Sequence, residues 1–213
     1  TDDGPLSTTR LSPSLAIDAA GAVYLAWTEP ASAPLGVRYR VSKDEGNTFE
    51  ASKPIACPPD KTLGCGIPRL ASDDGGRVFA VFVSATASIQ DILVSRLDSL
   101  PDATGAAVQV DDDGTPNPFA ADIAVDESGV VYVGWIRDFD APTAQIRLAK
   151  STDRGATFGP SVLVPTVALP WTLNLVAKGA LVHIAYATGT TGASGADAVY
   201  VTRSSDGGQT FGS

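Results

Sequence analysis

Short apolar stretches bounded by turns rich in Asp and Gly recur along the whole chain, and each of them predicts a β-strand. Four stretches are apolar at almost every position: Val23–Trp27, Val78–Phe82, Val131–Trp135 and Leu181–Tyr186. Another strand pattern precedes each of them and runs into the intervening turn, as in Leu15–Gly21. The chain therefore consists of repeated strand–turn–strand units.

Each unit contains a third strand, and in the first, third and fourth units it alternates apolar and polar residues, which is typical of a strand with one covered face. These strands are expected at Val37–Val41, Ile92–Ser95, Ile146–Ala149 and Val199–Thr202, and a fourth, outer strand is expected at Ala107–Val110. With 21 Gly, 15 Pro and only 18% charged residues, the composition also favours a turn-rich, all-β fold.

An eight-residue pattern, Ser-x-Asp-x-Gly-x-Thr-Phe, follows the third strand in three of the four units. Its fixed positions are Ser42, Asp44, Gly46, Thr48 and Phe49, then Ser151, Asp153, Gly155, Thr157 and Phe158, then Ser204, Asp206, Gly208, Thr210 and Phe211. The Asp residues of successive copies are 109 and 53 residues apart, so the first gap is close to twice the second. A strand-rich repeat of about 50 residues is the size of a β-propeller blade, and four blades of about 53 residues are predicted.

The second unit lacks the pattern, although Asp98 lies 54 residues after Asp44 and is expected at the position of the missing Asp. In the intact copies, the Asp side chain can accept hydrogen bonds from backbone N–H groups across a tight turn. The Gly allows a positive φ, and the Phe is expected to pack beneath the turn. One Asp in the same turn of each unit indicates a structural role rather than a catalytic one.

This pattern resembles the Asp-box, or bacterial neuraminidase repeat, of the sialidase-like β-propellers, and the resemblance extends over essentially the whole chain. It implies that each box joins the third and fourth strands of a blade, away from the active site. Propellers of this family usually have six or more blades, which implies that these four belong to a larger wheel completed by the same chain or a partner chain. A closed four-bladed ring is the alternative.

The four blades are expected at about 11–56, 67–110, 118–164 and 170–213. Residues 1–4 repeat the Asp-Asp-Gly ending of the run 111–114, which follows the outer strand of the second blade. Residues 1–4 are therefore expected to be the end of a preceding blade's outer strand.

The chain has a net charge of −9, which argues against binding nucleic acid through its phosphates and is expected of a soluble surface. No run of about 18 apolar residues occurs, so no membrane insertion is expected. The resemblance implies instead that the partner is a carbohydrate or an extracellular protein.

Cys57 and Cys65 lie close together in a loop-like stretch between two strand patterns. No zinc site is expected because no His or further Cys lies nearby, and His183 lies in an alternating strand where it is expected to pack. A disulfide that closes the short loop is the favoured interpretation; it would contribute about 2–3 kcal/mol and would imply a secreted or extracytoplasmic protein. Two free thiols are the alternative.

Candidate ligand-binding residues fall in the loops that join the second and third strands and in those that join the blades. These loops share one rim, which carries the pocket in sialidase-like proteins. The candidates are Arg10, Arg69, Arg137, Asp138, Asp140 and Trp171. The arginines could hold a carboxylate by paired hydrogen bonds, the Asp residues could act as acids, and the Trp could stack on a sugar ring. Ordinary solvated or packed rim residues are the alternative for each.

The run Asp111–Asp113 offers carboxylate oxygens, which calcium prefers, but its spacing does not match a calcium loop. The repetition of this run at residues 2–3 favours a repeated turn instead, so no metal or cofactor is expected.

For a sialidase, the resemblance implies three arginines around the substrate carboxylate, an acid/base Asp, a Tyr–Glu nucleophile pair and an Arg-Ile-Pro motif. The motif is absent, since Ile67-Pro68-Arg69 has its residues in a different order, and the Tyr residues lie within strand patterns without an evident Glu partner. We therefore expect a glycan- or protein-binding propeller without a catalytic constellation. The alternative is part of an exo-sialidase-type glycoside hydrolase whose remaining catalytic residues lie outside this chain.

Overall fold

The structure is a computed structural model, and it describes residues 11–29, 34–86, 89–98, 105–111, 118–138, 141–189 and 198–212. Within these ranges the secondary structure consists of fifteen β-strands in four antiparallel sheets, without a helix. The predicted all-β class is therefore confirmed. No helix able to cross a membrane occurs in the ranges just given.

Each sheet is a meander in which the strands lie in chain order. The first sheet contains β1 (Leu11–Ile17), β2 (Val23–Glu29), β3 (Gly36–Ser42) and β4 (Lys53–Ile55), and the second contains β5 (Gly64–Ser72), β6 (Val78–Ala85), β7 (Gln90–Arg96) and β8 (Val108–Gln109). The third contains β9 (Phe119–Val125), β10 (Val131–Arg137), β11 (Gln145–Ser151) and β12 (Val162–Val164), and the fourth contains β13 (Pro170–Lys178), β14 (Leu181–Thr188) and β15 (Ala198–Ser204).

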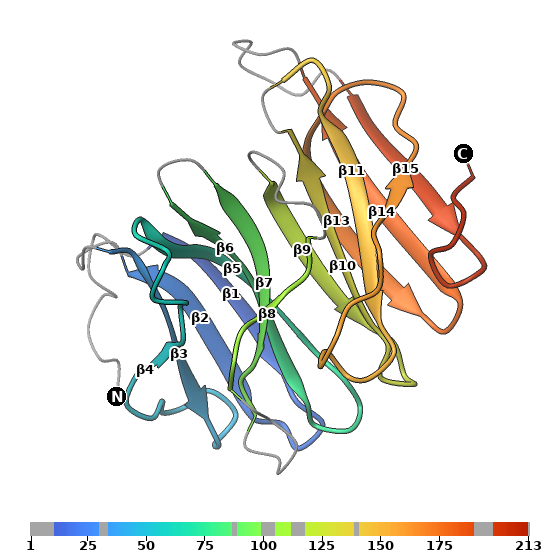
Figure 1. Ribbon diagram of the computed structural model, residues 1–213. Helices are drawn as coiled ribbons and strands as arrows, with labels where there is room; N and C mark the ends of the chain where they lie inside the picture. The colour runs from blue at the N-terminus through green and yellow to red at the C-terminus, as the bar shows by residue number, and fades with distance from the viewer. Residues whose placement is uncertain are drawn as a thin grey trace.

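The sheets stand face to face in chain order, from the first on the left of Figure 1 to the fourth on the right. The first strands of successive sheets are neighbours, since β1 contacts β5, β5 contacts β9, and β9 contacts β13. These four strands, which we call the inner strands, therefore line one edge of the array.

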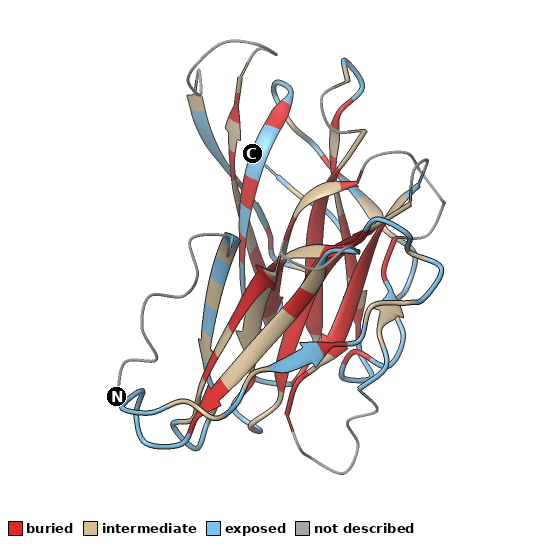
Figure 2. Ribbon diagram, turned by 90° about the vertical axis from the view of Figure 1, so that its left-hand side faces the viewer, coloured by how far each residue is buried: buried red, intermediate tan, exposed pale blue. Residues whose placement is uncertain are grey.

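Three apolar clusters join the four sheets, one at each interface. The strand β6 contributes to two of them, because its alternate residues point to opposite faces: Val78 and Phe82 pack toward the first sheet, whereas Phe79 and Val81 pack toward the third. The third cluster joins β10 and β11 to β13 and β14. Figure 2 shows how the buried residues gather on the strands inside the array.

The two end faces of the array carry apolar residues that are exposed. Inside the array, Leu175 of β13 and Leu148 of β11 are 4% and 2% exposed because the third and fourth sheets cover them. The residues in the corresponding registers at the two ends are Leu15 in β1 and Val201 in β15, and each is 62% exposed. Both end faces thus present the residue pattern of an interior face.

Hydrogen bonds lock the turn in each copy of the eight-residue pattern. In the first copy, Ser42 Oγ donates to Asp44 Oδ1 at 2.7 Å and accepts from Gly46 N at 2.8 Å. Asp44 accepts from the backbone N and the hydroxyl of Thr48 at 2.8 and 2.6 Å. The copies at 151–158 and 204–211 form the same four bonds at 2.5–3.0 Å.

These bonds stabilise the ionised carboxylates. The pKa of Asp44 falls to about 2, chiefly because of the Thr48 hydroxyl, and the pKa of Asp153 falls to about 2, chiefly because of the Ser151 hydroxyl. A carboxylate that is engaged in this way holds the turn and is poorly placed to exchange protons with a substrate near neutral pH.

In the second sheet, an apolar residue takes the first position of this pattern. In the first sheet, Val23 pairs with Ser42 at the end of β3. The matching residues in the second sheet are Val78 and Leu97, and the backbone N of Leu97 donates to Val78 O at 2.8 Å. Leu97 is buried and has no hydroxyl to hold a turn carboxylate.

Asp98 follows Leu97 directly and therefore lies one position before the site that corresponds to Asp44, so our expectation for Asp98 is wrong. Loops of unequal length shift a count along the chain, whereas strand pairing preserves the register. Asp98 instead accepts a hydrogen bond from Val78 N at 3.1 Å and forms an ion pair with Arg96 at 2.7 Å.

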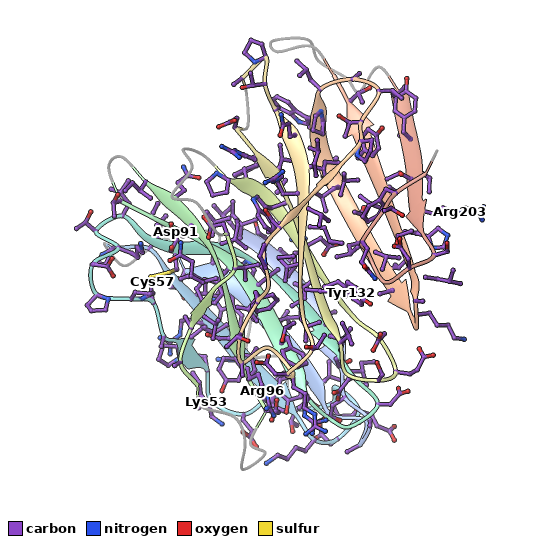
Figure 3. The ribbon with its side chains drawn as sticks, turned by 45° about the vertical axis from the view of Figure 1, so that its right-hand side comes forward. Lys53, Cys57, Asp91, Arg96, Tyr132 and Arg203 are labelled. Carbon is purple, nitrogen blue, oxygen red and sulfur yellow. A yellow bond between two sulfur atoms is a disulfide. The ribbon has the colours of Figure 1, made fainter. Side chains whose placement is uncertain are left out.

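The predicted disulfide between Cys57 and Cys65 is confirmed, with the two Cα atoms 5.9 Å apart. It closes a loop at the edge of the second sheet, where Figure 3 labels both Cys57 and Asp91. Lys61, within this loop, forms an ion pair with Asp91 on β7 and so fastens the loop to the sheet.

Candidate functional site

Strand pairing separates two rims of the array. Val23 pairs with both Ile17 and Ser42, so the turns after β1 and after β3 lie at the same end of the first sheet. The register of the other sheets repeats this arrangement. The opposite end, which we call the loop rim, carries the starts of the inner strands and the loops between the second and third strands.

Four polar residues occupy one register on the inner strands. They are Ser14, Arg69, Asp122 and Asn174, which pair with Ala26, Val81, Gly134 and Ala185 of the second strands. Each of these partners lies three positions after an equivalent valine, namely Val23, Val78, Val131 and Val182. Since the inner strands are neighbours, these four side chains form a line across the edge of the array. We call them the inner row.

Two members of the inner row bind backbone N–H groups of the next inner strand. Ser14 Oγ accepts from Leu70 N at 3.0 Å, and Asp122 Oδ2 accepts from Leu175 N at 2.7 Å. An inner strand has a free edge whose N–H groups need partners. Part of the row therefore stabilises the fold.

Arg69 does not fit this structural role, because a guanidinium has no acceptor. The corresponding group on the next inner strand is Ile123 N, which Arg69 cannot bind because both groups are donors. The side chain of Asp122 accepts from Ile123 N instead. Within the described part of the chain, the one hydrogen bond of the guanidinium runs from Nη1 to Pro68 O at 3.3 Å. Its remaining N–H groups are free to bind a ligand.

The positive charge of Arg69 interacts electrostatically with the carboxylate of Asp122. Burial raises the pKa of Asp122 above its ordinary value, and the bonds from Leu175 N, Ile123 N and the Asn174 side chain, together with the Arg69 charge, oppose this rise. The row thus combines a cationic donor, a carboxylate with a raised pKa and the amide of Asn174.

A β-bulge separates the inner row from the loop rim in every sheet. At three of the bulges a residue other than glycine has a positive φ: Ser12 at 53°, Ile67 at 57° and Ala120 at 50°. This conformation is strained, most of all for the β-branched Ile67. Because the bulge recurs, we attribute it to the fold, in which it bends the start of each inner strand at the loop rim.

The other predicted rim residues lie apart from the inner row. Arg137 ends β10, and its Nε lies 3.6 Å from the carboxylate of the adjacent Asp138. Trp171 lies next to the start of β13 and is 46% exposed. Arg10 and Asp140 lie outside the described residues. The ligand-binding role predicted for these residues stays a prediction.

A buried carboxylate pair lies at the loop-rim end of β7 and β8. Asp91 pairs with Lys61 and accepts from Gln109 Nε2 at 3.3 Å. Asp111 Oδ1 accepts from Ile92 N at 2.9 Å, whereas Oδ2 is buried without a partner among the described residues. Burial, with a smaller effect of Asp91, raises the pKa of Asp111 to about 6.

The calcium alternative concerned Asp111 together with residues 112–113, which lie outside the described residues. Among the residues that the structure describes, no group of three or more His, Cys, Asp or Glu side chains is placed to hold a metal ion. The predicted absence of a cofactor stays a prediction.

Arg69 was predicted from the sequence, whereas Ser14, Asp122 and Asn174 were not. A signal was present, because all four residues of the inner row, Arg69 included, directly precede the apolar residue that opens the repeated inner-strand pattern, at Leu15, Leu70, Ile123 and Leu175. Asp122 was not predicted because it lies inside a strand pattern, whereas ligand-binding residues were expected in loops.

No family model and no curated protein sequence matches this chain. Solved structures do resemble it. The Hadza microbial sialidase Hz136 matches with a TM-score of 0.71 and 12% identity over 95% of this chain and 46% of its own. The α-L-arabinanase of Penicillium chrysogenum, solved with arabinobiose, matches with a TM-score of 0.63 and 18% identity over 95% of this chain and 65% of its own. A PL25 ulvan lyase matches with a TM-score of 0.64 and 11% identity over 95% of this chain and 54% of its own.

The chain shares the β-propeller fold of these neighbours, and it spans about half to two thirds of their length. At identities below 20%, the likeness shows the fold alone. The three neighbours are by name two hydrolases and a lyase, so the shared fold does not determine the chemistry.

Proposed function

We propose that this chain is part of a secreted β-propeller that binds carbohydrate at the inner row, through Arg69 and Asp122. The observation that carries the proposal is the placement of Arg69, which occupies a register where its neighbours bind backbone groups and which has donors to spare. The carbohydrate-directed names of the structural neighbours support this choice of ligand.

The chemistry of the row suits a sugar. A guanidinium can donate two parallel hydrogen bonds to a sugar carboxylate or to adjacent hydroxyls. A carboxylate such as Asp122 can accept from a hydroxyl, and the exposed side chain of Asn174 can do both. Within the described residues the inner row holds one carboxylate, whereas glycoside hydrolysis generally uses two, which favours binding over catalysis.

A second candidate is glycoside hydrolysis, and it rests on the raised pKa of Asp122. Burial keeps this carboxyl protonated to a higher pH than usual, as a general acid requires. The second catalytic group would then lie outside the inner row.

The test is a glycan array followed by calorimetric titration of the glycans that bind, using α-sialosides, α-L-arabinosides and uronic-acid oligosaccharides. We expect saturable binding that Arg69→Ala weakens about ten-fold or more, because the guanidinium makes charge-assisted hydrogen bonds. Arg203→Ala, which removes an exposed arginine from β15, is the matched control and should leave binding unchanged.

Fluorogenic glycosides of the same sugars separate the two candidates. A protein that only binds leaves them intact. Turnover that Asp122→Asn abolishes while binding persists would favour the hydrolase, because the Asn can still accept from Leu175 N. Saturable binding that Arg69→Ala does not weaken would refute the proposed site.

We also propose that the three locked turns are Asp-boxes and that further blades cover the two exposed end faces in a larger wheel. The turn hydrogen bonds support the first proposal, and the exposed Leu15 and Val201 support the second. A disulfide is typical of proteins outside the cytoplasm, which supports secretion.

A further inference from the structure

A cavity of about 410 Å³ opens at the loop rim, beside the starts of the first three inner strands. Its wall includes Leu35 and Leu63 on one side, Val83 and Ala85 of β6, and Phe119 of β9. Its size lies within the range of small-molecule sites, about 300–1,000 Å³. We call it the rim pocket.

The rim pocket offers little to a sugar ring. The hydroxyl of Thr28 already accepts from Ile67 N at 2.8 Å, and the sulfur of Cys65 belongs to the disulfide. The other polar side chains in the wall are those of Ser12 and Gln90. A hydroxylated ring placed here would lose hydrogen bonds to water without replacing them, so the pocket favours a carbon-rich group.

The wall beside Leu35 is fixed by the backbone. Leu35 N donates to Leu63 O at 3.3 Å, and Cys65 N donates to Leu35 O at 3.0 Å. Gly64 lies between them with a φ of 91°, and a Cβ there would come within 2.1 Å of Leu35 O. A wall held in this way is formed before a ligand arrives, which reduces the entropic cost of binding.

The rim pocket adjoins the inner row. Ile67, in its wall, precedes Arg69 by two residues, and Phe119 precedes Asp122 by three. At about 3.3 Å per residue, these separations are roughly 7 and 10 Å along a strand. One ligand can therefore place a polar end at the row and an apolar end in the pocket.

We infer that the rim pocket receives an aromatic ring carried by the glycan that binds at Arg69 and Asp122. This inference rests on the proposed function. A cavity of about 150 Å³ lined by aliphatic and aromatic side chains is enough to hold benzene, so the rim pocket has room for a substituted ring. Phe119 supplies an aromatic partner, and the ring gains the burial of its carbon surface.

The experiment compares methyl, hexyl and phenyl glycosides of each sugar that binds, by calorimetric titration of the full chain. We expect the phenyl glycoside to bind at least ten-fold more tightly than the methyl glycoside. Ala85→Phe should remove this advantage by filling the pocket, whereas Ala156→Phe, at an exposed alanine on the opposite rim, should preserve it. Leu35→Ser, which makes an exposed part of the wall polar, provides a second test if Ala85→Phe does not fold.

The outcomes separate this inference from the proposed function. Equal affinity of the methyl and phenyl glycosides overturns the inference and leaves the proposed function standing. An equal gain from the hexyl glycoside overturns the assignment to an aromatic ring. If no glycoside binds, both proposals fall. The fluorine NMR signal of 4-fluorophenol, measured with the parent protein and with Ala85→Phe, then shows whether the pocket takes a free aromatic ring and whether Ala85→Phe closes it.

Discussion

Replacing Asp111 by Asn should stabilise the protein at neutral pH. Asp111 is 4% exposed, and among the described residues its Oδ2 has no partner. Burial raises its pKa from 3.8 to about 6, with a further contribution from Asp91, whose own charge is paired with Lys61. The folded protein therefore holds the Asp111 proton more tightly than the unfolded chain does between pH 3.8 and about 6.

The sign of the pH dependence follows from this difference. Because the native state binds more protons across that interval, the free energy of unfolding falls as the pH rises through it. The full loss is about 3 kcal/mol, of which about 1.4 kcal/mol falls between about pH 5 and about pH 7.5. Asn cannot ionise, and its amide oxygen can still accept from Ile92 N.

Urea denaturation followed by circular dichroism, at about pH 5 and about pH 7.5, measures the effect. We expect Asp111→Asn to stabilise by about 3 kcal/mol at the higher pH and by about half of that at the lower. Asp60→Asn removes an exposed carboxylate beside the same Lys61 and serves as the control. An Asp111→Asn variant that is less stable than the parent at both pH values, or shifted equally at both, would refute the reasoning.

Three further substitutions or treatments test the turns and the loop. Ser204→Ala should cost about 1–3 kcal/mol of stability because it leaves Gly208 N buried without its acceptor, while Ser205→Ala, at the exposed neighbour, should cost little. Gly208→Ala should destabilise more than Gly21→Ala in thermal unfolding: both have a positive φ, but only at Gly208 would a Cβ meet another side chain, at 2.6 Å. Reduction of the disulfide should lower the free energy of unfolding by about 2–3 kcal/mol, as measured in urea with and without dithiothreitol.

The strand pattern of the fold was predictable because burial on two faces leaves a continuous apolar record. The predicted stretches at 23–27, 78–82, 131–135 and 181–186 all lie within second strands of the four sheets. The hydrogen-bonded turn was equally predictable from the sequence, since a hydroxyl, a carboxylate and a glycine must recur at fixed spacing to form it.

The candidate site was predictable only in part. Arg69 was predictable as a charged residue near the loop rim, whereas only the strand register places Asp122 beside Arg69. Strand neighbours in different sheets are about 53 residues apart here, and no local pattern records which side chains meet across that distance. The same reason explains the error at Asp98, where counting along the chain could not replace strand pairing.

The exposed end faces have a consequence for handling this 213-residue chain in solution. The face with Val201 corresponds to the face by which a sheet inside the array packs against the following sheet. The face with Leu15 corresponds to the face by which a sheet packs against the preceding one. Two copies therefore present complementary surfaces of different kinds, and such head-to-tail contacts build a ring if they close and a filament if they do not. We expect its sedimentation coefficient to rise with concentration, and a charged residue in place of Val201 to suppress polymer growth.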